Sequence, residues 1–282
     1  MRRPLALLLT LLCGSSALAQ SVVYQTGFEN PPFAVGTELQ GQDGWTPSSS
    51  LPPFLSTGAA KITAADAKTG VQSVVVEGKA MTSAAEVAPY DAVGSFRRPV
   101  GYDTTATGQT LLRLSVDAKV TGPGTVPYSA FAGSLAARDN AGFTLAELEL
   151  GPDGSIAGFG DQAPGSAPAV SGVVAAGAWH ELAIEVDYLA KASTFFVDGA
   201  QVGLPVSFAG SGPSGVLARG ALVAYAGPNV PGGFDRSNHA IYFDDFSITA
   251  VPEPASLVLA GIGSVLGAAL CIGHARRQQQ LR

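Results

Sequence analysis

The sequence predicts an all-β fold, a sandwich or a barrel, and three observations predict it. Residues 111–120 read LLRLSVDAKV, where apolar and polar residues alternate with the period of two that is typical of a half-buried strand. Short strand-like runs recur along the chain, separated by turns rich in Gly, Pro and Asn. No long amphipathic helical pattern competes with them between the two hydrophobic ends.

Two hairpins extend this strand pattern. The turn Gly151–Gly154 lies between two strand-like runs, and its proline pre-sets φ while its last glycine relieves the turn exit. A second turn, Asp198-Gly199, follows the run Thr194–Val197. In the strand before that run, one face carries the apolar side chains of Leu182, Ile184, Val186 and Tyr188. The last strand-like run, residues 239–249, leads directly into the C-terminal tail.

Residues 1–19 have the pattern of a secretory signal peptide. Two arginines precede a short apolar run that ends in an A-x-A site, so cleavage is expected after Ala19. A lipoprotein signal centred on Cys13 is the alternative, but leucines instead of small residues precede that cysteine. The sequence therefore predicts export across the bacterial inner membrane.

The exported body, residues 20–250, contains no cysteine, so disulfides, a cysteine nucleophile and a thiolate metal site are excluded there. Five of the 16 basic residues and one of the 22 acidic residues lie in the two ends, which leaves 11 basic and 21 acidic residues in the body. This negative charge argues against nucleic acid and anionic lipid surfaces as partners. Divalent cations and neutral polymers remain compatible with it.

The C-terminal tail, residues 251–282, contains an uncharged apolar segment at 255–273. Its length is close to the about 20 residues that a helix needs to cross a bilayer core, so one transmembrane helix is predicted. Arg276 and Arg277 follow it, and the positive-inside rule places them on the cytoplasmic side.

The tail also resembles a known signal. Pro252-Glu253-Pro254, the apolar segment and the pair Arg276-Arg277 stand in the order and spacing of the PEP-CTERM sorting signal. The resemblance implies that an exosortase-type processing enzyme recognises the tail, and that the mature protein loses its membrane span. The two prolines favour an extended, accessible backbone outside the membrane. The alternative is an ordinary single-span anchor with a chance Pro-Glu-Pro linker.

The body resembles laminin-G-like and concanavalin A-like jelly rolls. The resemblance rests on WHELAIEVD at residues 179–187, where a tryptophan opens an alternating strand, and on FFVDG at 195–199. The segments YQTGFEN near the start and YFDDFSIT at 242–249 resemble the first and last strands of such modules, and Trp45 fits as well. The resemblance implies that residues 20–250 form one jelly-roll β-sandwich.

One inward carboxylate is expected on the last strand. Asp244 shares its alternation phase with Tyr242, Phe246 and Ile248, so it would point toward the core and need a partner. Calcium takes several carboxylate and carbonyl oxygens and is one such partner. The jelly-roll resemblance implies a structural calcium that pairs Asp244 or Asp245 with Glu29. The alternative is a carboxylate hydrogen-bonded to loop amides.

No catalytic residue is assigned. Glu147 with Glu149, or Glu185 with Asp187, would share a strand face, as a glycosidase pair requires. Neither pair continues into the E-x-D-x-x-E motif of glucanases, and a solvated polar strand face is the alternative interpretation. Four aromatic residues in loop-like surroundings are candidates for stacking on sugars: Trp45, Tyr90, Tyr102 and Tyr128. Packing in the core is the alternative for each of them.

Together these patterns predict a non-enzymatic protein of the cell envelope, surface or extracellular matrix that contacts exopolysaccharide. Two alternatives stay open. One is a secreted glycan hydrolase of the concanavalin A-like class, and the other is a structural coat protein without a ligand. No carbohydrate-binding residue is assigned from the sequence.

Overall fold

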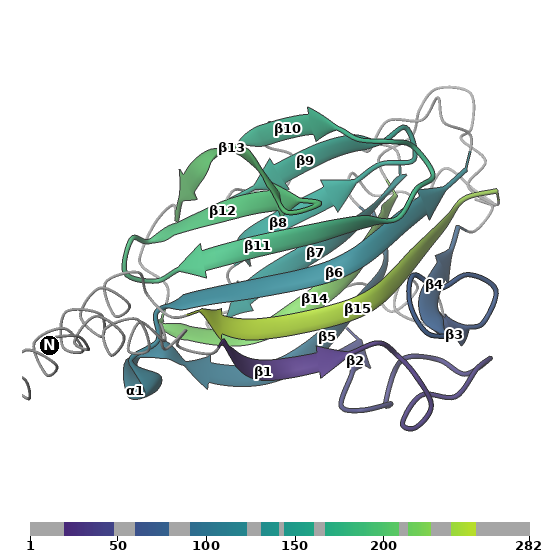
Figure 1. Cartoon of the computed structure of the whole chain (residues 1–282), viewed down its shortest axis with the longest axis horizontal. Helices are drawn as coiled ribbons and strands as arrows, with labels where there is room; N and C mark the ends of the chain where they lie inside the picture. Colours follow the sequence, from purple (N-terminus) through teal and green to yellow (C-terminus); the bar gives the residue numbers. More distant parts are fainter. Residues whose placement is uncertain are drawn as a thin grey trace, which may run out of the picture. The chain divides into compact units, whose positions relative to one another are not determined.

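The structure is a computed structural model of the chain, and it describes residues 20–47, 60–78, 91–122, 131–140, 144–160, 167–208, 214–226 and 238–251. The described residues build two β-sheets stacked as a sandwich (Figure 1). One short helix, α1 (Thr104–Thr107), follows strand β5. The compact unit that contains both sheets runs from Val22 to Ala250.

The first layer is an eight-stranded sheet, in which β1 (Ser21–Thr26) pairs with β15 beside the main path. The order along this path is β13 (Ala200–Ser207), β12 (Ala192–Val197), β11 (His180–Asp187), β6 (Leu111–Thr121), β15 (Ala240–Val251), β4 (Ser73–Glu77) and β3 (Ala60–Thr63). The first strand, β1, pairs with the last strand, β15, which places the two ends of the body in one sheet.

The second layer is a seven-stranded sheet. Its order is β10 (Val170–Val173), β9 (Ser155–Phe159), β8 (Thr144–Leu150), β7 (Phe131–Asp139), β14 (Val216–Ala226), β5 (Asp91–Asp103) and β2 (Thr46–Pro47). Its neighbours pair antiparallel, and this two-sheet architecture confirms the predicted all-β sandwich.

The strands that were predicted from alternation are present. Strand β6 alternates between partly and fully buried positions along its whole length. Strands β8 and β9 form the predicted hairpin, and the Gly151 N–H donates to the Ser155 carbonyl at 2.8 Å. The turn between β12 and β13 places Asp198 and Gly199 at φ 51° and 76°, which suits a two-residue hairpin turn.

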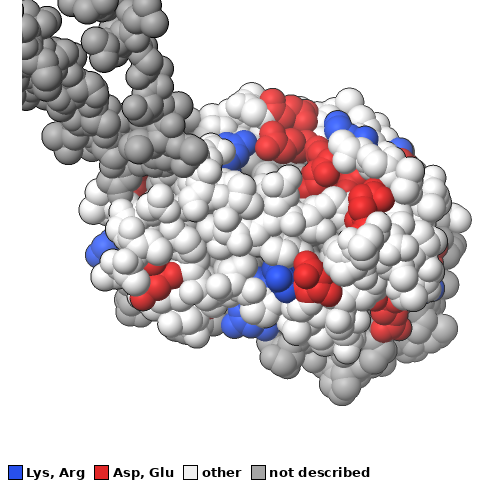
Figure 2. Space-filling model, turned by 60° about the horizontal axis from the view of Figure 1, so that its bottom comes forward, with Lys and Arg blue, Asp and Glu red and all other residues white. Residues whose placement is uncertain are grey.

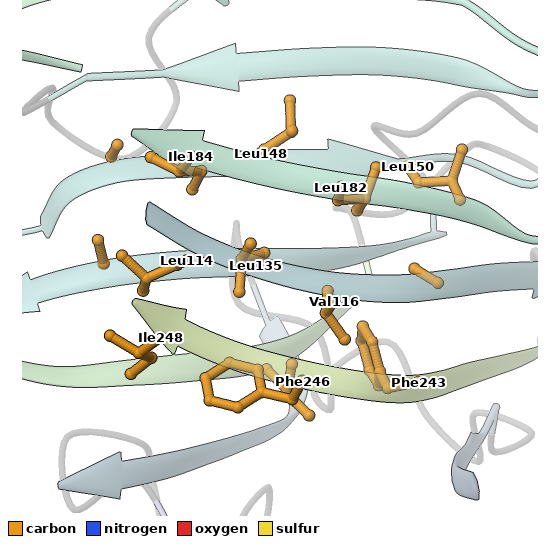
Figure 3. Close-up of a cluster of buried hydrophobic side chains, with 14 of the residues drawn as sticks. Leu114, Val116, Leu135, Leu148, Leu150, Leu182, Ile184, Phe243, Phe246 and Ile248 are labelled. Atoms are coloured by element: carbon orange, nitrogen blue, oxygen red, sulfur yellow. The ribbon is translucent and has the colours of Figure 1, made fainter. Parts of the chain in front are cut away.

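The core fills the space between the sheets. The labelled side chains of Figure 3 come from both layers and point toward one another. Leu114, Leu182 and Phe246 belong to the eight-stranded sheet and are fully buried, and Leu135 and Leu148 face them from the seven-stranded sheet. A continuous apolar interior of this kind supplies most of the stability of a chain without disulfides.

Glycines on the seven-stranded sheet make room for large side chains on the other. A Cβ at Gly133 would lie 2.6 Å from Ile241 Cγ2, and one at Gly220 would lie 2.6 Å from Phe246 Cζ. Both approaches are shorter than real Cβ contacts, so a larger residue at either position would push the sheets apart.

No helix among the described residues is long and apolar enough to cross a membrane. The predicted span 255–273 and the predicted signal peptide, residues 1–19, both lie outside the described residues.

Candidate functional site

The sorting motif lies directly after the last strand. Strand β15 ends at Val251, so Pro252 is the first residue beyond the sheet. Pro252, Glu253, Pro254, Arg276 and Arg277 all lie outside the described residues.

Asp244 points into the body, as expected, and is fully buried. Its Oδ2 accepts hydrogen bonds from the backbone N–H groups of Lys68 at 2.9 Å and Thr69 at 3.1 Å. Its Oδ1 accepts from the Asp245 N–H at 2.8 Å. The carboxylate therefore anchors the loop between β3 and β4 to the last strand.

The expected phase of the last strand is wrong before Asp244. Tyr242 is partly exposed, and Phe243 is buried in its place. Phe243 and Asp244 are consecutive buried residues, so the alternation breaks between them and is regular again from Asp244 to Phe246 and Ile248. Next to this break, Asp245 has a left-handed backbone with φ 47°. The regular alternation after Asp244 also separates the two aspartates, because Asp245 is only partly buried.

Asp245 and Glu29 contact the same loop as Asp244. The Thr69 hydroxyl donates to both carboxylate oxygens of Asp245, at 3.0 and 2.8 Å. Glu29 Oε1 accepts from the backbone N–H groups of Val71 at 2.7 Å and Gln72 at 2.9 Å. The structure thus brings the three predicted carboxylates, Glu29, Asp244 and Asp245, to one loop.

These contacts correspond to the hydrogen-bonded alternative for Asp244. Burial raises the pKa of Asp244 to about 6, although its bonds from backbone amides lower it. No group of three His, Cys, Asp or Glu side chains gathers within the described residues as a metal ion requires. Calcium binding stays a prediction.

We expect Asp244→Ala to lower the free energy of unfolding by about 3 kcal/mol, because three backbone N–H groups lose their charged acceptor inside the protein. Urea unfolding measures the change. The matched control is Asp245→Asn, which retains a side chain that tolerates positive φ and should cost less than about 1 kcal/mol. Equal stability of Asp244→Ala and the wild type would contradict the anchoring role.

Repeating these measurements with calcium tests the metal prediction separately. A calcium site in the native state adds about 2.7 kcal/mol at 100 times its Kd, and the double variant Asp244→Ala, Asp245→Ala should lose this gain. If calcium did not change the free energy of unfolding, or changed it equally in the double variant, the prediction of calcium binding at this loop would be wrong.

The four aromatic candidates for sugar stacking differ in their surroundings. Trp45 is fully buried and packs against Phe28 and Phe246 with ring centroids 5.7 and 5.2 Å apart, so core packing applies to it. The Tyr102 hydroxyl donates to Gln109 Oε1 at 2.6 Å, and the residue is partly buried. Tyr90 and Tyr128 lie outside the described residues.

The carboxylate pair on β11 has structural partners. Glu185 Oε1 lies 3.1 Å from Arg113 Nη1 in an ion pair. Asp187 accepts from the backbone N–H groups of Leu189 and Ala190, each at 2.8 Å, and so stabilises the turn before β12. Both carboxylates of this pair therefore have structural roles, one in an ion pair between neighbouring strands and one in a turn.

The carboxylate pair on β8 lies on the outer face of the seven-stranded sheet. Leu148, between Glu147 and Glu149, points into the core, so the two glutamates point the other way. Glu147 is 8% exposed and accepts a hydrogen bond from the Ser134 hydroxyl on β7. The alternative interpretation, a solvated polar strand face, therefore does not hold for Glu147, whereas Glu149 is partly exposed.

The environment changes the ionisation of this pair. Burial, and then the nearby charge of Glu147, raise the pKa of Glu149 far above the usual range of a carboxyl group. Two neighbouring carboxyl groups that cannot both ionise share a proton, which leaves one of them able to donate a hydrogen bond.

Three arginines lie on the same outer face. Arg219 of β14 is paired in register with Arg138 of β7, and Arg97 of β5 is paired with Ala221, two residues along β14. Ala136 and Ala221 lie between Glu147 and Arg97 in one row across the sheet. Together with Val223, these two alanines form a small buried cluster apart from the main core. Burial, and then the charges of Arg219 and Arg138, lower the pKa of Arg97 to about 10.

We name this outer-face group of Arg97, Arg138, Arg219, Glu147 and Glu149 the charged sheet face. Sequence reasoning missed its arginines, which lie on three strands far apart in the chain. The only signal was the outward phase of each arginine in its own strand, and that phase does not show which strands are neighbours.

Residues 250–277 match the PEP-CTERM protein-sorting motif, so the chain carries that motif in its C-terminal tail. The motif indicates an exported protein of the cell envelope and implies processing by an exosortase-type enzyme. No curated protein matches the chain.

Solved structures share the sandwich at low sequence identity. The CBM2 module of the evolved Dit protein of Lactobacillus casei phage J-1 is 13% identical, with a TM-score of 0.52, and the match covers 82% of this chain and 96% of the module. A carbohydrate esterase of the Shiga toxin-encoding bacteriophage phi24B is 12% identical, with a TM-score of 0.51, and 83% of this chain and 100% of that chain are covered. These likenesses show the jelly-roll β-sandwich fold alone.

A sialidase is also similar over part of its length. It is 14% identical with a TM-score of 0.42, and 73% of this chain matches. The match spans 17% of the sialidase.

Proposed function

We propose that this protein is a non-enzymatic component of the bacterial cell envelope or extracellular matrix, and that its β-sandwich contacts exopolysaccharide. The observation that carries the proposal is the charged sheet face. It gathers five charged side chains on one side of the sandwich, and two of them, Arg97 and Glu147, are buried. Charged groups are costly to bury, and clusters of them with shifted pKa values are typical of binding sites.

The sorting motif supports the same proposal from the other end of the chain. A protein carried to the envelope meets the polysaccharide layer there. The body between the two ends has no cysteine, so its stability rests on packing and does not depend on the redox state of its surroundings.

A secreted glycan hydrolase is the second candidate, and one observation favours it. Glu147 and Glu149 lie two residues apart on one face of β8, and the pKa of Glu149 is raised by burial and by its neighbour. A carboxyl group that stays protonated at neutral pH is what a glycosidase uses as its general acid.

Binding and hydrolysis measured on the same polysaccharides separate these candidates. We expect the protein recovered from its envelope to be retained on at least one immobilised bacterial exopolysaccharide, without release of new reducing ends. Reducing ends that appear with the wild type and disappear with Glu149→Gln would establish the hydrolase instead. A protein that neither binds nor cleaves any of them would be a coat protein.

A further inference from the structure

Several basic residues of the described body form ion pairs with acidic side chains. Arg98 lies 3.9 Å from Asp43, Arg113 pairs with Glu185 on the neighbouring strand, and Lys119 lies 2.7 Å from Asp66. Among the residues that the structure describes, neither Arg138 nor Arg219 forms an ion pair, and their Nε atoms are buried without a hydrogen-bond partner.

This arrangement is unusual in a body with 21 acidic and 11 basic residues, counted between the two ends. Arg138 and Arg219 are directly opposite on adjacent antiparallel strands, where like charges destabilise the pair. Burial is the main cause of the lowered pKa of Arg97, and the charges of Arg219 and Arg138 lower it further. A bound anion would relieve the repulsion between these like charges, since a guanidinium forms two parallel hydrogen bonds to a carboxylate.

We propose that Arg138 and Arg219, with Arg97 beside them, bind the carboxylate groups of an acidic polysaccharide. The inference rests on the proposed function and names the chemical class of its ligand. Ala136 and Ala221 lie between Arg97 and Glu147 and are fully buried, so the ligand contacts the partly exposed side chains of Arg138 and Arg219. Burial, and then the charge of Glu147, raise the pKa of Glu149, which favours a protonated carboxyl group that can donate to a ring hydroxyl or a carboxylate.

The acidic charge of the body favours a polysaccharide as the source of the anion. On the face drawn in Figure 2, acidic side chains gather in an arc, while basic ones stand apart in small groups. Nucleic acid carries one charge per about 1.7 Å, and a body with 21 acidic and 11 basic residues repels so dense a negative charge. A uronic acid polymer has more widely spaced charges and uncharged hydroxyl groups between them, so it suits an isolated basic cluster.

The test compares each acidic polymer with its own neutral form. Full-length wild-type protein is titrated with polygalacturonate, alginate and hyaluronan, and with the same polymers after reduction of their carboxyl groups to alcohols. We expect at least one acidic polymer to bind, with an affinity that falls as salt rises, and its reduced form to bind at least about tenfold more weakly. Equal affinity for both forms would overturn the carboxylate inference and leave polysaccharide binding intact. An absence of binding to either form would overturn both.

Charge-matched variants locate the site. Arg138→Gln with Arg219→Gln removes two positive charges from the charged sheet face, and Lys61→Gln with Lys191→Gln removes two from exposed positions elsewhere. We expect the arginine variant to lose at least about tenfold in affinity for the acidic polymer and the lysine variant to change less than about twofold.

A second arginine variant guards against a folding defect. Arg138→Lys with Arg219→Lys retains the charge but loses the paired donors of the guanidinium, so its affinity should lie between those of the wild type and the glutamine variant. Thermal melts confirm that each variant is folded. Equal losses in the arginine and lysine variants would overturn the placement of the site.

Discussion

Replacing Trp45 by alanine is expected to lower the free energy of unfolding by about 3–5 kcal/mol, the range for removing a buried aromatic side chain. Trp45 is fully buried and joins three aromatic rings at the first strand, with centroid distances of 6.4 Å to Tyr24, 5.7 Å to Phe28 and 5.2 Å to Phe246. Its Nε1 also donates to the Tyr24 hydroxyl at 3.2 Å. A natural domain has about 5–15 kcal/mol in total, so this variant should approach the limit of folding.

Urea unfolding followed by circular dichroism measures the loss, and Trp179→Ala is the matched control. Trp179 is only partly buried, donates to Asp66 at 3.2 Å and packs edge-on against Tyr242. Its removal should cost less than half as much as that of Trp45. If the two variants were equally stable, Trp45 would not be a central part of the core, and its role as an exposed sugar-stacking residue would return.

The strands of the body could be predicted because their signals are local. The alternation in residues 111–120 and the turn residues at Gly151–Gly154 and Asp198-Gly199 act within a few positions of the chain, and each has the predicted conformation. The inward position of Asp244 was predicted for the same reason. Its phase with Phe246 and Ile248 holds, because the break in the alternation lies before Asp244, between Phe243 and Asp244.

The left-handed backbone at Asp245 was not predictable from the alternation. An aspartate tolerates this conformation, but the sequence does not mark where a strand uses it. The partners of Asp244 were also hidden, because the N–H groups of Lys68 and Thr69 belong to a loop about 175 residues earlier in the chain. Contacts of this range depend on the order of strands in the sheet.

The charged sheet face shows the same limit for function. Glu147 and Glu149 were recognised as a pair because two residues on one strand necessarily share a face. Arg138 and Arg219 became visible only when β7 and β14 were found to be neighbours. A ligand site assembled across strands is thus a property of topology, whereas a sorting signal is read from one continuous segment.

That contrast leads to the prediction with the clearest outcome. We expect the protein recovered from its native envelope and medium to end near Pro252–Pro254, with a mass that lacks the predicted span and Arg282. Strand β15 ends at Val251, so the tripeptide follows the folded body without an intervening linker. From the sequence, the two prolines are expected to disfavour helix and sheet pairing in this segment and so to make it accessible to a processing enzyme.

Intact-mass analysis of Glu253→Ala tests the motif itself. The variant should retain its span and remain in the membrane fraction, whereas the control Glu77→Ala, which removes an exposed carboxylate from the end of β4, should be processed as the wild type is. If wild type and Glu253→Ala both kept Arg282 in the membrane, the tail would act as an ordinary anchor. The charged sheet face would then work at the membrane surface, and a polysaccharide ligand would have to reach it there.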